Sequence, residues 1–239
     1  MNYASPTYVE ETRIGFRFLS SFTWQHHVLR VAINDLKTLC GEPPPQGGVL
    51  LDAGCGQGKS FRLLQDAFQP KRLIGLDADP HSLELSRVEA AKEQIDAELI
   101  AGDCAQITLP DRSVDIVFCH QTFHHLVEQE AALAEFWRVL KPGGMLLFAE
   151  STKAYIDSWV IRWFFRHPMH VQKSADGYLQ MLRDQGFEFE QRHVSLPYLW
   201  WSRARDFGLL ERWHLKQPPL PGGREETLVN VAARKPEPA

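Results

Sequence analysis

The sequence has few cysteines, no surplus of basic residues and no long hydrophobic segment. Its four cysteines lie far apart and form no Cys-x-x-Cys pair, so a disulfide-stabilised scaffold is not expected. Lysine and arginine number 26 against 30 aspartate and glutamate residues, which argues against nucleic-acid binding through bulk positive charge. No apolar run approaches the roughly 18 residues of a membrane-spanning helix, and the first residues lack the pattern of a secretion signal. We therefore expect a cytoplasmic protein.

The residues that are present indicate a globular α/β protein. The chain has 239 residues, of which 44% are hydrophobic and 23% charged, and this length suits one domain with modest additions. From residue 49 onward, short apolar runs are predicted strands: Val49–Ala53, Leu73–Leu76, Glu98–Ala101, Val114–Cys119 and Met145–Ala149. Amphipathic stretches between them are predicted helices: Lys59–Phe68, Pro80–Gln94 and Glu128–Leu140. This alternation predicts a parallel sheet covered by helices on both faces.

The flanking segments continue this pattern less regularly. Further helices are predicted at Thr7–Leu19, Trp24–Leu39 and Ser174–Gln185, and closing strands at Phe187–Val194 and Thr227–Ala233. Two segments fit no core element and are interpreted as insertions: Thr152–Lys173 and Ser195–Glu226. Residues 235–239 are expected to be a frayed tail.

A glycine-rich turn follows the first predicted strand, with the sequence Asp52-Ala53-Gly54-Cys55-Gly56-Gln57-Gly58. Glycines at alternate positions allow a sharp turn and bring backbone N–H groups close to a ligand. The following helix directs its N-terminus toward the same place. A dinucleotide fingerprint would need the third glycine one position later, and a P-loop would need glycine in place of Ala53. Neither of these phosphate-binding motifs is therefore present.

This turn resembles the first motif of the class I S-adenosylmethionine-dependent methyltransferases. Further matches follow in order at Gly75-Leu76-Asp77, Gly102-Asp103-Cys104, Asp115 to His120, and Trp137 to Gly144. The resemblance extends from Val49 to about Glu150. It implies an α/β, Rossmann-like fold: a seven-stranded, mostly parallel sheet with helices on both faces and an antiparallel last strand. It also implies one domain with a helical lid (1–47), a cofactor-binding core (48–151), and substrate insertions with closing strands (152–239).

The resemblance further implies S-adenosyl-L-methionine as the cofactor and S-adenosyl-L-homocysteine as the product. Asp77 would accept hydrogen bonds from the ribose hydroxyls, as acids at strand ends do in ribose recognition. Asp103 would accept one from the adenine amino group, and Asp52 would support the turn or meet the ammonium group. The full set of expected cofactor-binding residues is Asp52, Gly54, Cys55, Gly56, Gly58, Asp77, Ala78, Asp103, Cys104 and His120.

Two residues are candidates for a catalytic general base. His124 lies in the segment after the fourth strand, which faces the active site in the family, and Glu150 ends the fifth strand. A structural role for His124 and turn capping by Glu150 remain open alternatives, and His125 is expected to be a buried structural histidine. The spacing of His120 and His124 would suit a metal on a helix face, but no carboxylate or cysteine has matching spacing nearby. No metal site is therefore expected.

The C-terminal part of the sequence is rich in aromatic residues. Five of the seven tryptophans follow Glu150, and Tyr155, Trp159 and Trp163 recur every four residues, as on one face of a helix. These aromatics form either a lid on the core or an apolar substrate pocket. Arginines or a histidine would then meet an anionic group: Arg162, Arg166, His167, Arg203 or Arg205. Membrane-surface contact and RNA stacking are weaker alternatives.

The expected function is direct in-line methyl transfer to an oxygen or nitrogen atom of a small, partly apolar metabolite. The DNA amino-methyltransferases carry Asn/Asp-Pro-Pro-aromatic after the fourth strand, whereas this chain has Cys119-His120-Gln121-Thr122. Nucleic acid is therefore an unlikely partner, and no membrane span is expected. The alternatives are a protein or RNA methyltransferase, or a non-catalytic regulator that binds S-adenosylmethionine.

Overall fold

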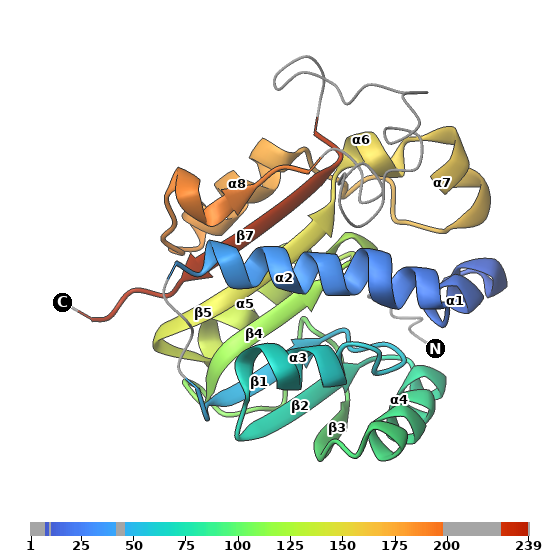
Figure 1. Ribbon diagram of the computed structural model, residues 1–239. Helices are drawn as coiled ribbons and strands as arrows, with labels where there is room; N and C mark the ends of the chain where they lie inside the picture. The colour runs from blue at the N-terminus through green and yellow to red at the C-terminus, as the bar shows by residue number, and fades with distance from the viewer. Residues whose placement is uncertain (1–7, 10, 42–45, 198–225, 239) are drawn as a thin grey trace, which may run out of the picture.

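A seven-stranded sheet forms the centre of the molecule in the computed structural model, which describes residues 8–9, 11–41, 46–197 and 226–238 (Figure 1). The strands are β1 (Val49–Ala53), β2 (Arg72–Asp77), β3 (Ala97–Ala101), β4 (Val114–His120), β5 (Leu140–Ser151), β6 (Val194–Ser195) and β7 (Leu228–Arg234). Their order is β3-β2-β1-β4-β5-β7-β6. The strands β1 to β5 are parallel, and β7 is antiparallel to both of its neighbours. The predicted fold class is confirmed.

The strand order reverses direction at β1. The chain proceeds from β1 through β2 to β3 on one side, and then returns to place β4 and β5 on the other side of β1. Asp52 on β1 is in register with both Gly75 of β2 and Phe118 of β4. Ligands of open α/β sheets bind at such a reversal, beyond the carboxyl ends of the strands.

Helices cover both faces of the sheet. One face is covered by α2 (Arg30–Leu39) and α3 (Phe61–Phe68), with α4 (Pro80–Glu93) beside β3. The other face is covered by α5 (Gln129–Val139) and α8 (Ala175–Asp184). Neighbouring residues of β1 point to opposite faces of the sheet. Leu50 packs in the core under α2 and α3, and Leu51 packs in the core under α5 and α8. This two-sided burial explains why the strands read as continuous apolar runs.

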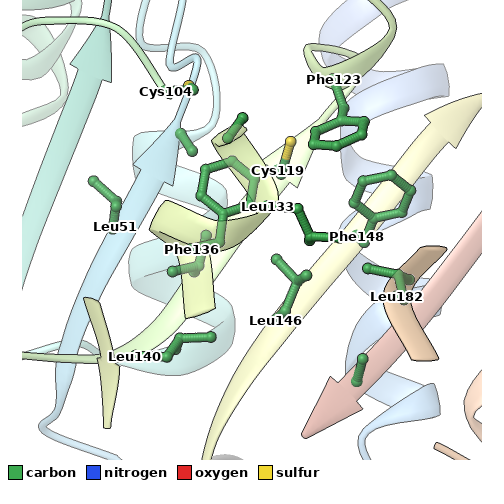
Figure 2. Close-up of a cluster of buried hydrophobic side chains, with 14 of the residues drawn as sticks. Leu51, Cys104, Cys119, Phe123, Leu133, Phe136, Leu140, Leu146, Phe148 and Leu182 are labelled. Carbon is green, nitrogen blue, oxygen red and sulfur yellow. The ribbon is translucent and has the colours of Figure 1, made fainter. Parts of the chain in front are cut away.

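Figure 2 shows the core beneath α5 and α8. The rings of Phe123 and Phe148 meet edge to face with centroids 5.2 Å apart, and Phe136 lies against the same group. Phe123 belongs to the turn that follows β4, so the core fixes this turn from below. None of the helices in the described part of the chain combines the length and apolar character that a bilayer span requires.

The helix boundaries follow the capping signals in the sequence. The Asp79 carboxylate accepts hydrogen bonds from the backbone N–H groups of His81 and Ser82, with Pro80 at the first position of α4. Ser174 caps α8 by accepting a hydrogen bond from the N–H of Gly177. Both caps agree with the predicted helix starts.

The N-terminal part differs from the sequence prediction. The helix expected over Thr7–Leu19 begins only at Arg13, as α1 (Arg13–Leu19), because Thr12 is its N-cap. Tyr8 instead forms a bridge with Leu126, and the N–H of Val9 donates to the carbonyl of His125. The next segment begins as a π-helical turn, η1 (Trp24–Leu29), before α2. The predicted lid thus divides: α2 packs on the sheet, whereas α1 and η1 border the cavity described below.

The region after β5 also departs from expectation. The aromatic stripe does not lie on one helix, because Ser158 is extended and separates α6 (Lys153–Ile156) from α7 (Trp159–Phe164). Tyr155 is buried, whereas Trp163 is 79% exposed. Two short helices therefore occupy part of the first predicted insertion.

The predicted closing strands are confirmed only in part. The second is present as β7, but the expected strand Phe187–Val194 is largely wrong. It contains the short helix η3 (Gln191–His193), and Glu190 and His193 form a capping box there. Val194 and the following serine pair with β7 as β6, and Glu188 forms an isolated antiparallel bridge with Arg234 of β7. Most of the second predicted insertion, with Arg203 and Arg205, lies outside the described residues.

The predicted frayed tail is anchored at its first residue. The Lys235 side chain is only 8% exposed, and its Nζ donates to the carbonyls of Trp137 (2.6 Å) and Leu140 (2.8 Å) at the end of α5. Its backbone N–H donates to the carbonyl of Gly144. The ammonium group satisfies carbonyls that a helix end leaves without intrahelical partners.

We predict that Lys235→Ala lowers the free energy of unfolding by about 1–3 kcal/mol, because it leaves two carbonyls of the α5 terminus without their charged donor. Urea denaturation measures this change. Lys71→Ala, at an exposed lysine between α3 and β2, is the matched control and should change the free energy by less than about 0.5 kcal/mol. Equal effects of the two substitutions would contradict the anchoring role.

Candidate active site

A cavity of about 560 Å³ opens at the carboxyl ends of β1 to β4. The strand ends contribute polar residues, including Asp52, Asp77 and Asp103. The N-terminal segment contributes apolar side chains from α1 and η1, among them Phe16 and Trp24. Polar groups from the sheet and apolar groups from the N-terminal helices therefore line the same space.

The glycine-rich turn has the backbone conformation that its sequence predicts. Gly54, Gly56 and Gly58 all have positive φ angles, of 77°, 52° and 71°. A Cβ atom on Gly54 would lie 2.1 Å from Cγ2 of Thr122, so a side chain there would displace the turn after β4. A Cβ atom on Gly56 would meet no atom within 4 Å. Gly56 therefore leaves its backbone open for a ligand to approach.

Asp77 connects this turn to the end of β2. Its Oδ2 accepts the N–H of Gly56 (2.8 Å), and its Oδ1 accepts the N–H of Asp79 (2.9 Å). Burial raises the pKa of Asp77, while the two backbone N–H groups act in the opposite direction. Each carboxylate oxygen retains a lone pair for a ligand hydroxyl.

Asp52 is the most deeply buried acid of the cavity wall, with 2% of its surface exposed. Its carboxylate accepts a hydrogen bond from the hydroxyl of Ser60 and makes no ion pair with a described residue. Burial raises its pKa to about 7, and the nearby Asp77 carboxylate adds to the shift. A bound cation would offset part of this cost of burying a carboxylate.

The next strand ends contribute Asp103 and Cys104 from the loop after β3 and His120 from β4. Oδ1 of Asp103 accepts the N–H of Ala105 at 2.8 Å, which fixes the side chain in a local turn. Burial raises the pKa of Cys104, so its thiol is uncharged. Burial lowers the pKa of His120 to about 3, so this imidazole is neutral where it stacks on Phe118.

The structure brings nearly all of the predicted cofactor residues together. All of them except Gly58 line the cavity: Asp52, Gly54, Cys55, Gly56, Asp77, Ala78, Asp103, Cys104 and His120. Gly58 is needed for packing, because a Cβ atom there would lie 2.8 Å from Phe61 and 2.9 Å from Ser86. Contact of these residues with a cofactor remains a prediction.

The two predicted catalytic residues lie behind the cavity wall. His124 and Glu150 are 4% and 0% exposed, and neither belongs to the residues that line the cavity. They contact each other, with His124 Nδ1 2.6 Å from Glu150 Oε2. Oε1 of Glu150 accepts the N–H groups of Thr122 (2.9 Å) and Phe123 (2.8 Å). Glu150 thus holds the turn after β4, and a direct role for either residue in catalysis stays a prediction.

The sequence predicts His125 as a structural histidine and offers His167 as a candidate contact for an anionic group, but it does not point to Glu11 or to the approach of these residues to one another. His125 and Glu11 line the cavity and approach each other, with Nε2 of His125 3.8 Å from Oε1 of Glu11. Burial raises the pKa of Glu11 to about 7. The nearby backbone N–H of Arg166 acts in the opposite direction, although it does not form a hydrogen bond with the carboxylate. Burial lowers the pKa of His125, and it lowers that of His167 to about 3. No local motif predicts this juxtaposition, since the three residues come from three separate segments.

The chain is similar to known methyltransferases. Residues 51–148 match the family model described as a methyltransferase domain. The malonyl-(acyl-carrier protein) O-methyltransferase of Yersinia pestis is 38% identical over 120 residues, which are 49% of this chain and 42% of that protein. The demethylmenaquinone methyltransferase of Deinococcus radiodurans is 32% identical over 120 residues, 49% of this chain and 50% of that protein. The chain thus matches about half the length of these curated relatives.

A solved structure supports the same fold assignment. The SAM-dependent methyltransferase from Aquifex aeolicus superposes with a TM-score of 0.62 over 92% of this chain and 97% of that chain. The two sequences are 19% identical, so this similarity concerns the fold alone.

We predict that the stability difference between the wild type and Asp52→Asn depends on pH. The folded-state pKa of Asp52 is raised from 3.8 to about 7, so between these values the folded state binds more protons than the unfolded state. The wild type should therefore lose stability relative to Asp52→Asn as pH rises from about 4 to about 7. Urea denaturation of both proteins across this range measures the trend. A difference that stays constant with pH would contradict the raised pKa.

Proposed function

We propose that the chain, whose residues 51–148 match a methyltransferase-domain family model, is a class I S-adenosylmethionine-dependent methyltransferase that methylates an oxygen or nitrogen atom of a small, partly apolar metabolite. The single observation that carries the proposal is the cavity itself. Strand-end carboxylates line it together with aromatic side chains from α1 and η1. Its volume of about 560 Å³ is within the usual range of small-molecule sites.

The residues present fit S-adenosylmethionine. The Asp77 carboxylate is already oriented by two backbone N–H groups and retains lone pairs for two vicinal hydroxyls. Asp52 is a buried acid without a cationic partner among the described residues, which suits a ligand with an ammonium group. The open backbone at Gly56 allows the ligand to approach closely.

When bound, the cofactor supplies an activated methyl group on a positively charged sulfur. The chain's own contribution is to orient the two reactants and exclude water. A neutral His120 avoids like-charge repulsion with this sulfonium. The indole of Trp24, with its centroid 5.5 Å from that of the His120 ring, offers an aromatic face that attracts cations.

The size and the partly apolar lining of the cavity support a small acceptor rather than a polymer. Tyr8, Phe16 and Leu126 contribute apolar surface to the same cavity that the strand-end acids line. The two relatives described above are named for different acceptors, malonyl-(acyl-carrier protein) and demethylmenaquinone. These names support methyl transfer and leave the acceptor of this chain as a proposal.

We predict that Asp77→Ala weakens the binding of S-adenosylmethionine at least about tenfold, since charge-assisted hydrogen bonds contribute about 1.5–3 kcal/mol each. Isothermal titration calorimetry measures the affinity, and thermal unfolding checks that the variant folds. Asp66→Ala, at an exposed aspartate on α3, is the matched control and should bind as the wild type does. Unchanged affinity of Asp77→Ala would reject the ribose-binding role.

The activity is tested with a methyl-labelled donor. We predict that the protein, incubated with labelled S-adenosylmethionine and a broad metabolite extract, transfers the label to a low-molecular-weight compound detected by mass spectrometry. Label in added protein or RNA would overturn the small acceptor and favour the polymer alternative. Tight donor binding without any labelled product would overturn catalysis and favour a regulator.

A further inference from the structure

Three histidines from two distant segments come together beside the cavity. His124 and His125 follow β4, whereas His167 follows α7. Each offers a ring nitrogen, and these nitrogens lie within 4.8 Å of one another. The ring centroids are 4.4 Å apart for His124 and His125, 5.1 Å for His124 and His167, and 4.7 Å for His125 and His167.

Glu11 places a carboxylate beside one member of this group, with its Oε1 3.8 Å from Nε2 of His125. Both of its oxygens are buried without a hydrogen-bond partner among the described residues, and the same is true of Nδ1 of His125. Burying polar atoms without hydrogen-bond partners costs free energy, and an ion bound between them would supply the partner. Gly15 makes room for the carboxylate, because a Cβ atom there would lie 1.7 Å from Oε2 of Glu11.

One member of the group is already oriented as metal ligands usually are. Nδ1 of His124 contacts Oε2 of the fully buried Glu150, which leaves Nε2 of His124 as the free nitrogen. When a histidine binds a metal through one ring nitrogen, the other nitrogen commonly donates a hydrogen bond to a carboxylate, which fixes the orientation of the ring. Glu150 is in turn fixed by the backbone N–H groups of Thr122 and Phe123.

We propose that Glu11, His124, His125 and His167, here called the histidine cluster, bind one divalent transition-metal ion. Three imidazole nitrogens and one carboxylate form the donor set that Zn²⁺ and its neighbours prefer, rather than Mg²⁺ or Ca²⁺. Nitrogens bound to one tetrahedral Zn²⁺ lie about 3.4 Å apart, so the three histidine rings, whose nitrogens lie within 4.8 Å of one another, must move closer by up to about 1.4 Å.

The ion would lie at the cavity wall, because Glu11 and His125 line the cavity. There it would act as a Lewis acid toward an oxygen atom of a bound acceptor. The site does not depend on the proposed function, since metal binding is measured without methyl transfer. The proposed metal site also differs from the pair His120 and His124 that was considered in the sequence analysis, because His120 is not part of the histidine cluster.

The test is a titration of the chelator-treated 239-residue protein with Zn²⁺ and, separately, with Co²⁺. We expect one equivalent to bind by calorimetry, with Co²⁺ developing a visible absorption band from nitrogen and oxygen coordination. His167→Ala should weaken binding at least about tenfold and abolish the band. His170→Ala, at an exposed histidine three residues further along, is the matched control and should retain both.

A second variant and a second measurement distinguish the loss of the metal site from misfolding of a variant. Glu11→Gln keeps the size of the side chain and should also weaken binding. Zn²⁺ should raise the melting temperature of the wild type and of His170→Ala more than that of His167→Ala or Glu11→Gln. Equal binding by the wild type, His167→Ala and Glu11→Gln would mean adventitious ions at other histidines, and would overturn the proposal. Failure of the wild type to bind one equivalent would overturn it as well.

Discussion

The hydrogen bond from the Gly56 N–H to the Asp77 carboxylate fastens the glycine-rich turn to the end of β2. The backbone N–H groups of Gly54 and Cys55 reinforce it by donating to the carbonyl of Leu76. On the other side, the Thr122 hydroxyl donates to the carbonyl of Gly54, and the Thr122 N–H donates to Glu150. A continuous set of contacts therefore joins the carboxyl ends of β2, β1, β4 and β5, and the cavity rests on it.

The cover of the cavity is linked to the same turn. Gln57 donates to the carbonyl of Phe16 at 2.9 Å and accepts a hydrogen bond from the Ser20 hydroxyl at 2.7 Å. These bonds connect α1 and its C-terminal end to the glycine-rich turn. The Val9 N–H donates to the carbonyl of His125, so the N-terminal segment is also tied to the turn after β4. The apolar part of the cavity is thus positioned by the backbone that forms its polar part.

Local patterns in the sequence were sufficient for the strands β1 to β5 and for the polar half of the cavity. Strands buried on both faces give continuous apolar runs, and parallel strands bring acids at their carboxyl ends, such as Asp77 and Asp103, to one edge. Contacts between distant segments left no such pattern. His124 pairs with Glu150, Glu11 approaches His125, and His167 approaches both histidines. These contacts depend on how the turn after β4 packs against β5, the N-terminal segment and the segment after α7. The aromatic periodicity of Tyr155 and Trp163 was misleading because one extended residue between them ends the helix.

The central claim is that S-adenosylmethionine binds across the carboxyl ends of β1, β2 and β3. A crystal structure of the protein with S-adenosyl-L-homocysteine tests it most directly. The account predicts the ribose hydroxyls within hydrogen-bond distance of Asp77, the adenine amino group beside Asp103, and the amino-acid end over the turn from Gly54 to Gly58. A ligand bound at another place in the fold would contradict the account.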